Sequence, residues 1–298
     1  MRKNCLAASL LALSLCFSLA ACSGGTSAPA DTTAPESTAP AETTPAETAP
    51  VETDRGDSDL AYVQDKGTLV VGITNFAPMD YKEEGSDEWV GFDADMARAF
   101  AESLGVEVEF SEITWDYKVM ELDAKSVDVL WNGMTLTDEV KSSMDTSVPY
   151  CTNYQVLVYP KDRAADFEGL TSLEGLTVAV ESGSAGEDAA EALGATTVPL
   201  QAQSNTLMEV SAGTSDAAVI DVLMAAATIG DGTSYADLAY SLDLNEMQGL
   251  EPEEYGVGFR KGSDLVDVFN EFWSGAVADG TVEETAAAYG LQDAVILE

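Results

Sequence analysis

From Tyr62 onward, short apolar runs typical of strands alternate with longer amphipathic runs typical of helices. Such alternation favours sheets of parallel strands with helices on both faces. The alternation forms two series, one on each side of Pro160, and therefore predicts an α/β fold with two lobes. The expected strands are 68–73, 106–110, 127–130, 154–159, 176–180, 217–220 and 254–259, and the expected helices are 91–105, 115–122, 137–144, 187–193, 206–212, 264–278 and 282–289.

The charge balance excludes several classes of function. Thirteen lysines and arginines stand against 53 aspartates and glutamates, which gives a net charge of −40, and histidine is absent. A strongly acidic surface excludes nucleic acid and anionic lipid as partners. The lack of histidine excludes Ser-His-Asp and Cys-His catalysis and imidazole metal sites. Because no calcium-binding loop pattern occurs either, we expect no metal, no cofactor and no catalytic residue.

The N-terminus has the pattern of an export signal. Arg2 and Lys3 precede the apolar run 6–19, which ends in Leu-Ala-Ala-Cys at Cys22. This ending is similar to the lipobox of bacterial lipoproteins, so residues 1–21 are interpreted as a signal peptide and Cys22 as the lipidated residue. An ordinary secretory signal followed by a chance cysteine is the alternative. The lipoprotein interpretation places the protein on the outer face of a bacterial cell membrane, in a Gram-positive organism.

Residues 22–59 are rich in Thr, Ala, Pro and Glu and contain no aromatic residue. Such a composition cannot bury enough apolar surface to fold, so we expect a disordered tether. Apart from the signal cysteines and Cys22, only Cys151 remains, and the exported domain must fold without an internal disulfide. Its length allows a core large enough for this.

Ten short fragments of the folded region resemble, in the same order, the family 3 extracellular solute-binding proteins, which are the amino-acid receptors of ABC importers. The similar fragments include Val70–Gly72, Phe76–Pro78, Gly91–Asp95, Trp115–Asp116, Gly133–Thr135, Pro149–Tyr150, Ser215–Asp221 and Tyr255–Val257.

The resemblance implies a two-lobed, periplasmic-binding-protein-like clamshell with a mostly parallel sheet in each lobe. Lobe 1 would comprise residues 60–157 and 251–298, and lobe 2 residues 158–250. Segments 154–159 and 254–260 would be hinge strands, and a ligand would bind in the cleft and stabilise the closed form. The expected partners are a small amino acid or amine, an ABC permease and an ATPase subunit, because this chain has no phosphate-binding loop. The domain is expected to be a monomer.

The resemblance also implies the ligand-binding residues. Phe76 and Trp115 match aromatic positions that sandwich the ligand, although each could instead be core. Asn132, Gly133 and Thr135 match strand-end positions that bind it through backbone and hydroxyl groups, and Thr135 could also be a helix cap. Ser184 matches a loop at a helix start that receives the ligand carboxylate, where Glu187 and Asp188 would compete. Asp221 matches the acid that binds the α-ammonium.

One position departs from the family pattern. The family usually has an arginine, which pairs with the α-carboxylate, where this chain has Val140. Neighbouring Lys141 lies about 100° further around the helix and cannot reproduce the arginine fork. Two readings remain: backbone groups and Thr135 hold a carboxylate unaided, or the ligand has none there. The acidic surface and Asp221 favour a cationic or amine-bearing ligand.

Two other functions remain possible on this scaffold. An enzyme such as a dehydratase could use Glu181 as an acid, although the sequence pairs no second carboxylate with it. A sensor or adhesin could use the same fold for binding at the cell surface. The sequence does not identify the ligand or its affinity.

Overall fold

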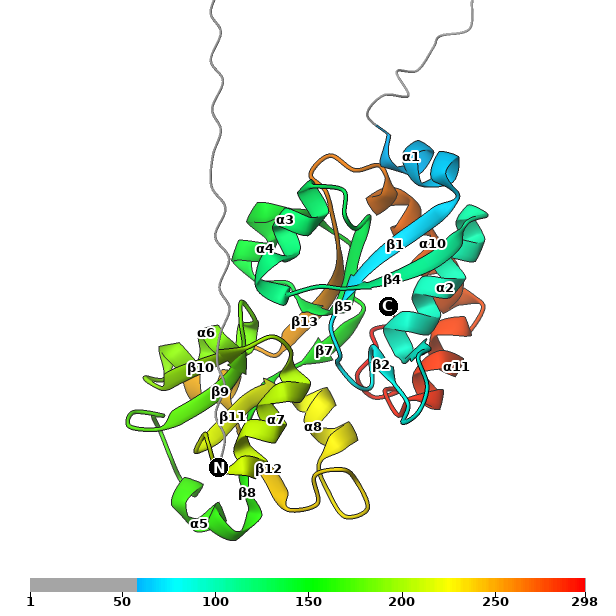
Figure 1. Ribbon diagram of the computed structural model, residues 1–298. Helices are drawn as coiled ribbons and strands as arrows, with labels where there is room; N and C mark the ends of the chain where they lie inside the picture. Colours follow the sequence, from blue (N-terminus) through cyan, green and yellow to red (C-terminus); the bar gives the residue numbers. More distant parts are fainter. Residues whose placement is uncertain (1–57, 298) are drawn as a thin grey trace, which may run out of the picture. The chain divides into compact units, whose positions relative to one another are not determined.

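The protein is described by a computed structural model over residues 58–297 (Figure 1). Cys22, the signal peptide and nearly all of the expected tether lie outside the described residues. Within 58–297 the chain forms two sheets flanked by helices, as the sequence pattern predicts, and each sheet combines a parallel set of strands with antiparallel pairings. None of the described helices is long and apolar enough to cross a membrane.

The first sheet contains three parallel strands, extended by antiparallel ones. Its order is β4 (Glu107–Glu112), β1 (Thr68–Ile73), β5 (Val129–Thr135), β13 (Glu253–Phe259) and β6 (Asp145–Thr146), with β7 (Cys151–Asn153) also paired to β13. Helices cover both faces of this sheet (Figure 1). One face has α2 (Phe92–Leu104), α10 (Leu265–Ala278) and α11 (Thr281–Ala288), and the opposite face has α3 (Lys118–Asp123) and α4 (Asp138–Ser143). The remaining elements here are α1 (Asp59–Lys66), the 3₁₀ turn η1 (Trp115–Tyr117) and the hairpin of β2 (Tyr81–Lys82) and β3 (Trp89–Val90).

The second sheet is built in the same way. Its order is β10 (Thr196–Leu200), β9 (Thr177–Glu181), β11 (Ala217–Asp221), β8 (Gln155–Pro160) and β12 (Leu238–Asp243). The first three strands are parallel, β8 is antiparallel to β11, and β12 is antiparallel to β8. The helices of this part are α5 (Ala164–Phe167), α6 (Ala185–Ala192), α7 (Gln203–Ala212), α8 (Val222–Thr228) and α9 (Leu244–Gln248), after the turn η2 (Lys161–Arg163).

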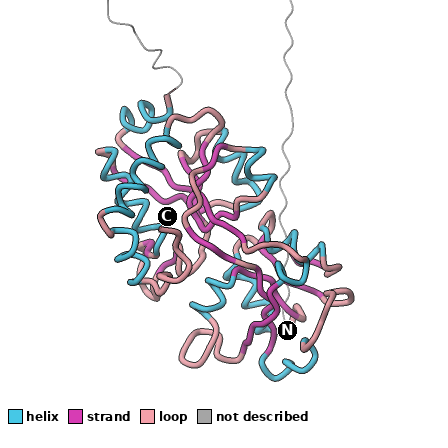
Figure 2. The backbone as a smooth tube through the Cα atoms, turned by 180° about the vertical axis from the view of Figure 1, so that it is seen from behind, coloured by secondary structure: helices cyan, strands magenta, loops and turns pink. Residues whose placement is uncertain are grey.

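The chain passes between the two sheets twice. β7 ends at Asn153 in the first sheet and β8 begins at Gln155 in the second, so Tyr154 carries the first passage. The return lies between α9 and β13. The sequence led us to expect segments 154–159 and 254–260 as hinge strands that cross between the lobes. Instead, β8 and β13 each belong to one sheet, and the crossings lie just before them. Figure 2 shows strands of both sheets running toward the region where the chain passes between them.

Aromatic side chains fill the core beside the first sheet. Trp131 packs edge-to-face on Phe269, with ring centroids 5.0 Å apart, and Tyr150 lies 5.4 Å from Trp273. All four residues are buried. This rigid core supports the carboxyl ends of β1 and β5, where the cavity described below begins.

Two details around β5 differ from the sequence prediction. The strand does not turn at Gly133 but continues to Thr135, because β13 pairs with it up to Tyr255 opposite Thr135. Gly133 takes a left-handed φ of 55° within the strand, where the pairing register shifts. The next helix is capped by Thr137, whose hydroxyl accepts a hydrogen bond from the Val140 amide at 3.1 Å. Thr135 is therefore not the helix cap.

Candidate ligand-binding site

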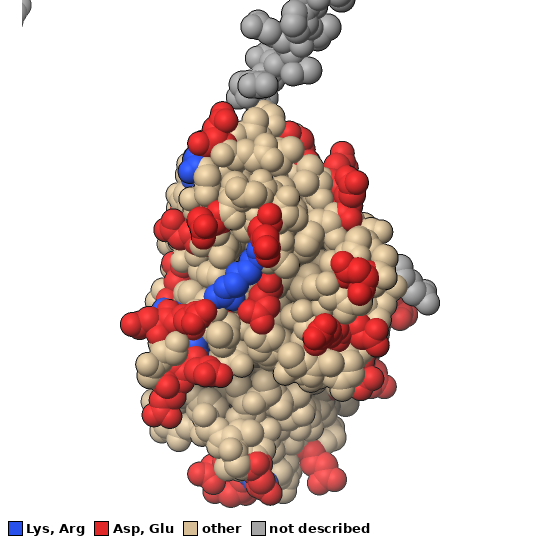
Figure 3. Space-filling view, turned by 90° about the vertical axis from the view of Figure 1, so that its right-hand side faces the viewer, with Lys and Arg blue, Asp and Glu red and all other residues tan. Residues whose placement is uncertain are grey.

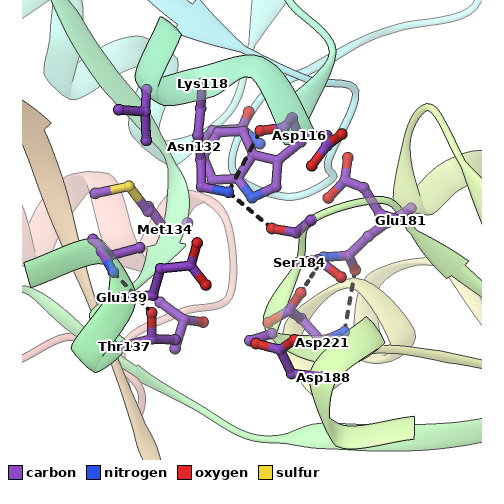
Figure 4. Close-up of a pocket in the computed structure, with 18 of the residues that line it drawn as sticks. Asp116, Lys118, Asn132, Met134, Thr137, Glu139, Glu181, Ser184, Asp188 and Asp221 are labelled. Carbon is purple, nitrogen blue, oxygen red and sulfur yellow. Dashed lines mark hydrogen bonds between the residues drawn. The ribbon is translucent and has the colours of Figure 1, made fainter. Parts of the chain in front are cut away.

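A cavity of about 220 Å³ lies between the carboxyl ends of the two sheets. Its volume is below the range typical for drug-sized ligands, so the occupant must be small. Figure 4 shows Asp116, Lys118 and Glu139 on the wall from the first sheet, and Glu181, Asp188 and Asp221 on the opposite wall. Of the residues expected from the sequence, the cavity is lined by Trp115, Asn132, Gly133, Thr135, Val140, Ser184 and Asp221.

Phe76 is the one predicted ligand-binding residue that the structure does not bring to the cavity wall. Its ring is 1% exposed and packs edge-to-face on Tyr255, with centroids 6.3 Å apart. The ring lies directly behind Gly133: a Cβ added to this glycine would come within 2.3 Å of it. Phe76 therefore supports the strand that forms the wall, and Trp115 is the aromatic residue that faces the cavity.

Asp221, at the end of β11, is held by four neutral donors. Its Oδ1 accepts hydrogen bonds from Asn153, from Gln155 at 3.0 Å and from the Tyr255 hydroxyl at 2.7 Å. Its Oδ2 accepts from the Gln203 amide. Burial, together with the charge of Glu253, raises the pKa of Asp221 to about 6 despite these donors. The carboxylate is rigid and still faces the cavity.

The Thr135 hydroxyl is bonded to an acid of the protein itself. The hydroxyl donates to Glu253 Oε2 at 3.0 Å, and the same oxygen accepts from Asn153 and Gln155. A carboxylate placed beside Thr135 would also lie close to the charge of Glu253. This wall of the cavity therefore does not favour anions.

In the loop before α6, a backbone amide already donates to a glutamate of the same helix. The Gly183 amide donates to Glu187 Oε2 at 2.7 Å, and the Ser184 hydroxyl caps the helix by accepting from the Glu187 amide at 3.2 Å. The Gly183 N–H, a donor that the family resemblance assigns to a ligand carboxylate, is therefore already bonded to Glu187. An anion bound at this loop would have to displace Glu187 from the Gly183 amide, as the sequence leads us to expect.

Glu181 is a cavity residue whose surroundings the sequence did not reveal. It ends β9, is 3% exposed, and its Oε1 has no hydrogen-bond partner. Burial raises its pKa to about 8, with a further increase from Asp221. The sequence pairs no second carboxylate with Glu181; the structure corrects this, because Asp221 and Asp116 line the same cavity.

Lys118 is the one basic residue among the cavity residues, and it was missed because nothing in the sequence fixes which way α3 points it. Its ammonium lies 5.2 Å from the Trp115 ring centroid and donates to the Gly183 carbonyl oxygen at 2.8 Å. This bond joins the walls contributed by the two sheets. Burial lowers the pKa of Lys118, while the surrounding carboxylates oppose the shift.

Asn132 and Gly133 are fixed by neighbours behind the wall. The Asn132 amide group exchanges two hydrogen bonds with Thr74, at 2.9 and 3.0 Å. The Gly133 amide donates to Asp93 Oδ2 at 2.7 Å, and Tyr150 donates to the same oxygen at 2.8 Å. Asp93 is fully buried, and burial raises its pKa to about 7. These contacts hold the wall in shape.

The cavity carries a large excess of negative charge. Five carboxylates line it, Asp116, Glu139, Glu181, Asp188 and Asp221, against the single ammonium of Lys118. Val140 contributes no donor; it is buried in an apolar cluster with Met134 and Met144. Acidic side chains also predominate on the outer face seen in Figure 3. Within 58–297 no group of three or more Cys, Asp or Glu is arranged to hold a metal ion.

Because burial raises the pKa of Asp93, Glu181 and Asp221, the folded state retains protons that the unfolded chain has lost. The stability that they provide is complete below about pH 4 and is lost as pH rises through about 6 to 8. We expect the unliganded protein to lose a few kcal/mol of unfolding free energy between pH 5 and pH 8.5. Urea denaturation at both values should show a smaller loss in Glu181→Gln. An equal loss in both proteins would contradict this assignment.

Two sheets that meet at a small polar cavity define the class of two-lobed small-molecule-binding proteins. The profile of the bacterial extracellular solute-binding proteins, family 3, matches residues 69–292. This chain belongs to that family, and the fold and family expected from the sequence are thereby confirmed. Membership implies a location outside the cytoplasm.

Relatives and solved structures agree with this assignment. The arginine-binding extracellular protein ArtP of Bacillus subtilis is 30% identical over 77% of this chain and 88% of its own length. The L-cystine-binding protein TcyA of the same species is 28% identical, with coverages of 80% and 87%. A mutant of the arginine-binding protein ArgBP from T. maritima superimposes with a TM-score of 0.69 at 30% identity, covering 78% of this chain and 98% of that one. A histidine-bound substrate-binding protein from Streptococcus pneumoniae gives a TM-score of 0.67 at 28% identity, covering 78% and 96%.

Proposed function

We propose that this protein is the substrate-binding component of an ABC importer and captures an amino acid or an amine-bearing derivative. The observation that carries the proposal is the charge of the cavity, where five carboxylates face one ammonium. Asp221 provides a fixed, buried anion for the ligand amine, and the Trp115 ring covers its apolar part. Relatives whose names specify arginine, cystine and histidine support the amino-acid class.

The same cavity is poor in groups that hold a carboxylate. Val140 stands where the family has its arginine, the Thr135 hydroxyl donates to Glu253, and the Gly183 amide donates to Glu187. Lys118 is the remaining cation, with two of its protons directed to backbone carbonyls. A ligand with a weakly held carboxylate, or with none, therefore fits better than one that depends on an arginine clamp.

Closure of two lobes is proposed to couple binding to delivery, with the boundary moved from the expected 157/158 to Tyr154 because β8 belongs to the second sheet. A ligand that contacts both walls stabilises the closed form by its differential affinity. The passages at Tyr154 and before β13 would be the hinges, and the bond from Lys118 to Gly183 would be made on closing. We further propose that the monomeric receptor is anchored by a lipid on Cys22 and passes its ligand to the permease and ATPase subunits.

A thermal-shift screen tests the receptor function. The compounds are the twenty amino acids, ornithine, citrulline, agmatine, putrescine and cadaverine. A ligand that binds only the native protein adds about 4 kcal/mol of stability at a thousand times its Kd. We expect a clear rise in melting temperature for a subset of amines and none for their N-acetylated forms. If acetylation has no effect, or no compound raises the melting temperature, the proposal is contradicted.

An enzyme on the same scaffold is the second candidate, and one observation favours it. Glu181 and Asp221 share a cavity, and their surroundings set their pKa values to about 8 and about 6, an arrangement that suits a general acid beside a charged carboxylate. One structural relative, at 31% identity, is an ancestral amino-acid-binding protein described as a precursor of cyclohexadienyl dehydratase.

Incubation with the ligand separates these functions. Ligand that is recovered unchanged identifies a receptor, and ligand that is converted to a product identifies an enzyme. A sensor would lack permease and ATPase genes beside its own.

A further inference from the structure

Glu181 is a buried carboxyl group that the fold satisfies only in part. It is 3% exposed at the end of β9, on the cavity wall, and its Oε1 has no hydrogen-bond partner. A buried charge without a partner is costly, and a native structure retains such a group chiefly where a ligand or water completes it. Lys118 does not complete it, since this ammonium is directed to the Gly183 carbonyl oxygen.

The neighbouring acid, Asp221, is held very differently. β9 and β11 are adjacent parallel strands, with Ala218 opposite Ala179, so Glu181 and Asp221 lie at neighbouring strand ends. Asp221 accepts hydrogen bonds from four side chains of the protein, whereas Oε1 of Glu181 accepts none. The cavity thus contains two neighbouring carboxyl groups, one held in place by the fold and one with an oxygen left open to a ligand.

The Thr74 hydroxyl and the Gln203 backbone N–H act on the Glu181 carboxyl and lower its pKa, but they leave Oε1 without a hydrogen-bond partner. Gln155 Oε1 is a second buried acceptor without a partner, because the Nε2 of this side chain is committed to Asp221 and Glu253. One N–H of the Asn132 amide donates to Thr74 Oγ1. A molecule that satisfies this part of the cavity must bring N–H donors and, because of Glu181, positive charge.

We propose that Glu181 forms a second cation subsite, which selects ligands that carry an ammonium or guanidinium group in addition to the amine bound at Asp221. Gln155 Oε1 accepts a further N–H from the same group. The preferred ligands are therefore dibasic amino acids and diamines rather than amino acids with neutral side chains. The inference rests on the proposed receptor function and specifies its substrate class.

Two matched pairs of compounds test the subsite by titration calorimetry. L-Arginine and L-citrulline have nearly the same shape, but citrulline has a neutral urea in place of the guanidinium. Cadaverine and 1-aminopentane differ by one terminal ammonium and contain no carboxylate. We expect the protein to bind the dibasic member at least tenfold more tightly in at least one pair. In Glu181→Gln this preference should fall to less than threefold through weaker binding of the dibasic member.

Glu168→Gln is the matched control, because this glutamate follows α5 in the same part of the chain, is exposed and does not line the cavity. It should keep the full preference. A preference that survives in Glu181→Gln, or that is absent from the unmodified protein in both pairs, overturns the subsite. If dibasic and monobasic compounds bind equally, the receptor function stands without it. If none of the four binds, the subsite is also overturned, and the wider amine screen then decides the receptor function separately.

Proton linkage gives a second measurement. Burial raises the pKa of Glu181 to about 8, and a bound cation favours its charged form, so binding of the dibasic compound should release protons. Its affinity should rise from pH 6.5 to pH 8.5 and change less in Glu181→Gln, in which Asp221 and Lys118 still titrate. The charged groups that face Glu181 across the cavity are Asp116 and Lys118 from η1 and α3, Glu139 from α4, Asp188 from α6 and Asp221 from β11. An identical pH dependence in both proteins would contradict the subsite.

Discussion

Asp221→Asn should remove ligand binding while the protein remains folded. The substitution keeps the shape of the side chain but removes the only cavity carboxylate that the fold holds with four hydrogen bonds. Leaving a desolvated ligand amine without its counter-charge costs about 2–5 kcal/mol, which is roughly a 30-fold to several-thousand-fold loss of affinity. Titration calorimetry with the tightest amine from the screen measures this loss.

Asp216→Asn is the control for this experiment. Asp216 immediately precedes the other end of β11, where it accepts hydrogen bonds from Arg163 at 3.3 Å and from the Thr177 amide at 3.1 Å. It does not line the cavity, so its replacement should leave affinity within about twofold. Circular dichroism checks that both variants are folded. Equal affinity in Asp221→Asn and the unmodified protein would remove Asp221 from the site.

Gly133→Ala should strongly destabilise the protein. The residue has a left-handed φ of 55°, and a Cβ would lie 2.3 Å from the Phe76 ring and 3.1 Å from the Tyr255 ring. Both rings are buried and have no room to move aside. The left-handed backbone costs about 1–2 kcal/mol and the overlap adds about 1–3 kcal/mol. Urea denaturation should therefore show a loss of about 2–5 kcal/mol.

Gly105→Ala separates the two causes. Gly105 has a similar left-handed φ of 74°, at the end of α2, but a Cβ there would meet nothing within 4 Å. This variant should lose only the backbone contribution, about 1 kcal/mol. If the two alanine variants are equally stable, the Phe76 ring is not the support of the cavity wall that the structure indicates.

Local signals in the sequence were enough to locate most of the secondary structure. The apolar stripe of α2 and its stop at Gly105 placed that helix within one residue at each end. The apolar runs of β1 and β11 were equally clear because these strands are buried. Periodicity alone therefore predicted the two α/β series, and the similar fragments predicted their arrangement as two lobes.

Features that depend on distant partners could not be predicted in this way. The extension of β5 beyond Gly133 results from pairing with β13, more than a hundred residues later in the chain. The same pairing brings Glu253 to the Thr135 hydroxyl, which sequence comparison had reserved for a ligand. Short strands such as β6 and β7 carry little periodicity and depend on the same neighbour.

The cavity was predicted in its location but not in its charge. Matching to the family pattern identified Trp115 and Asp221, yet it also nominated Phe76, which packs behind the wall. Lys118 and Glu139 lie on short helices whose orientation is set by tertiary packing, so no sequence signal marked them as cavity residues. The sequence itself shows that position 140 has no arginine. The structure adds that the Thr135 hydroxyl and the Gly183 amide, which could have bound a carboxylate, donate to glutamates of the protein instead.

Recovery of a bound amine tests the central claim most directly. The protein is equilibrated by dialysis with an equimolar mixture of the amino acids and amines of the screen, washed, denatured, and its retained small molecules are identified by mass spectrometry. The proposed function predicts about one equivalent of intact amine per protein, with dibasic compounds enriched. It also predicts little retention by Asp221→Asn. Retention of no amine, equal retention by Asp221→Asn, or recovery of a converted product would contradict it.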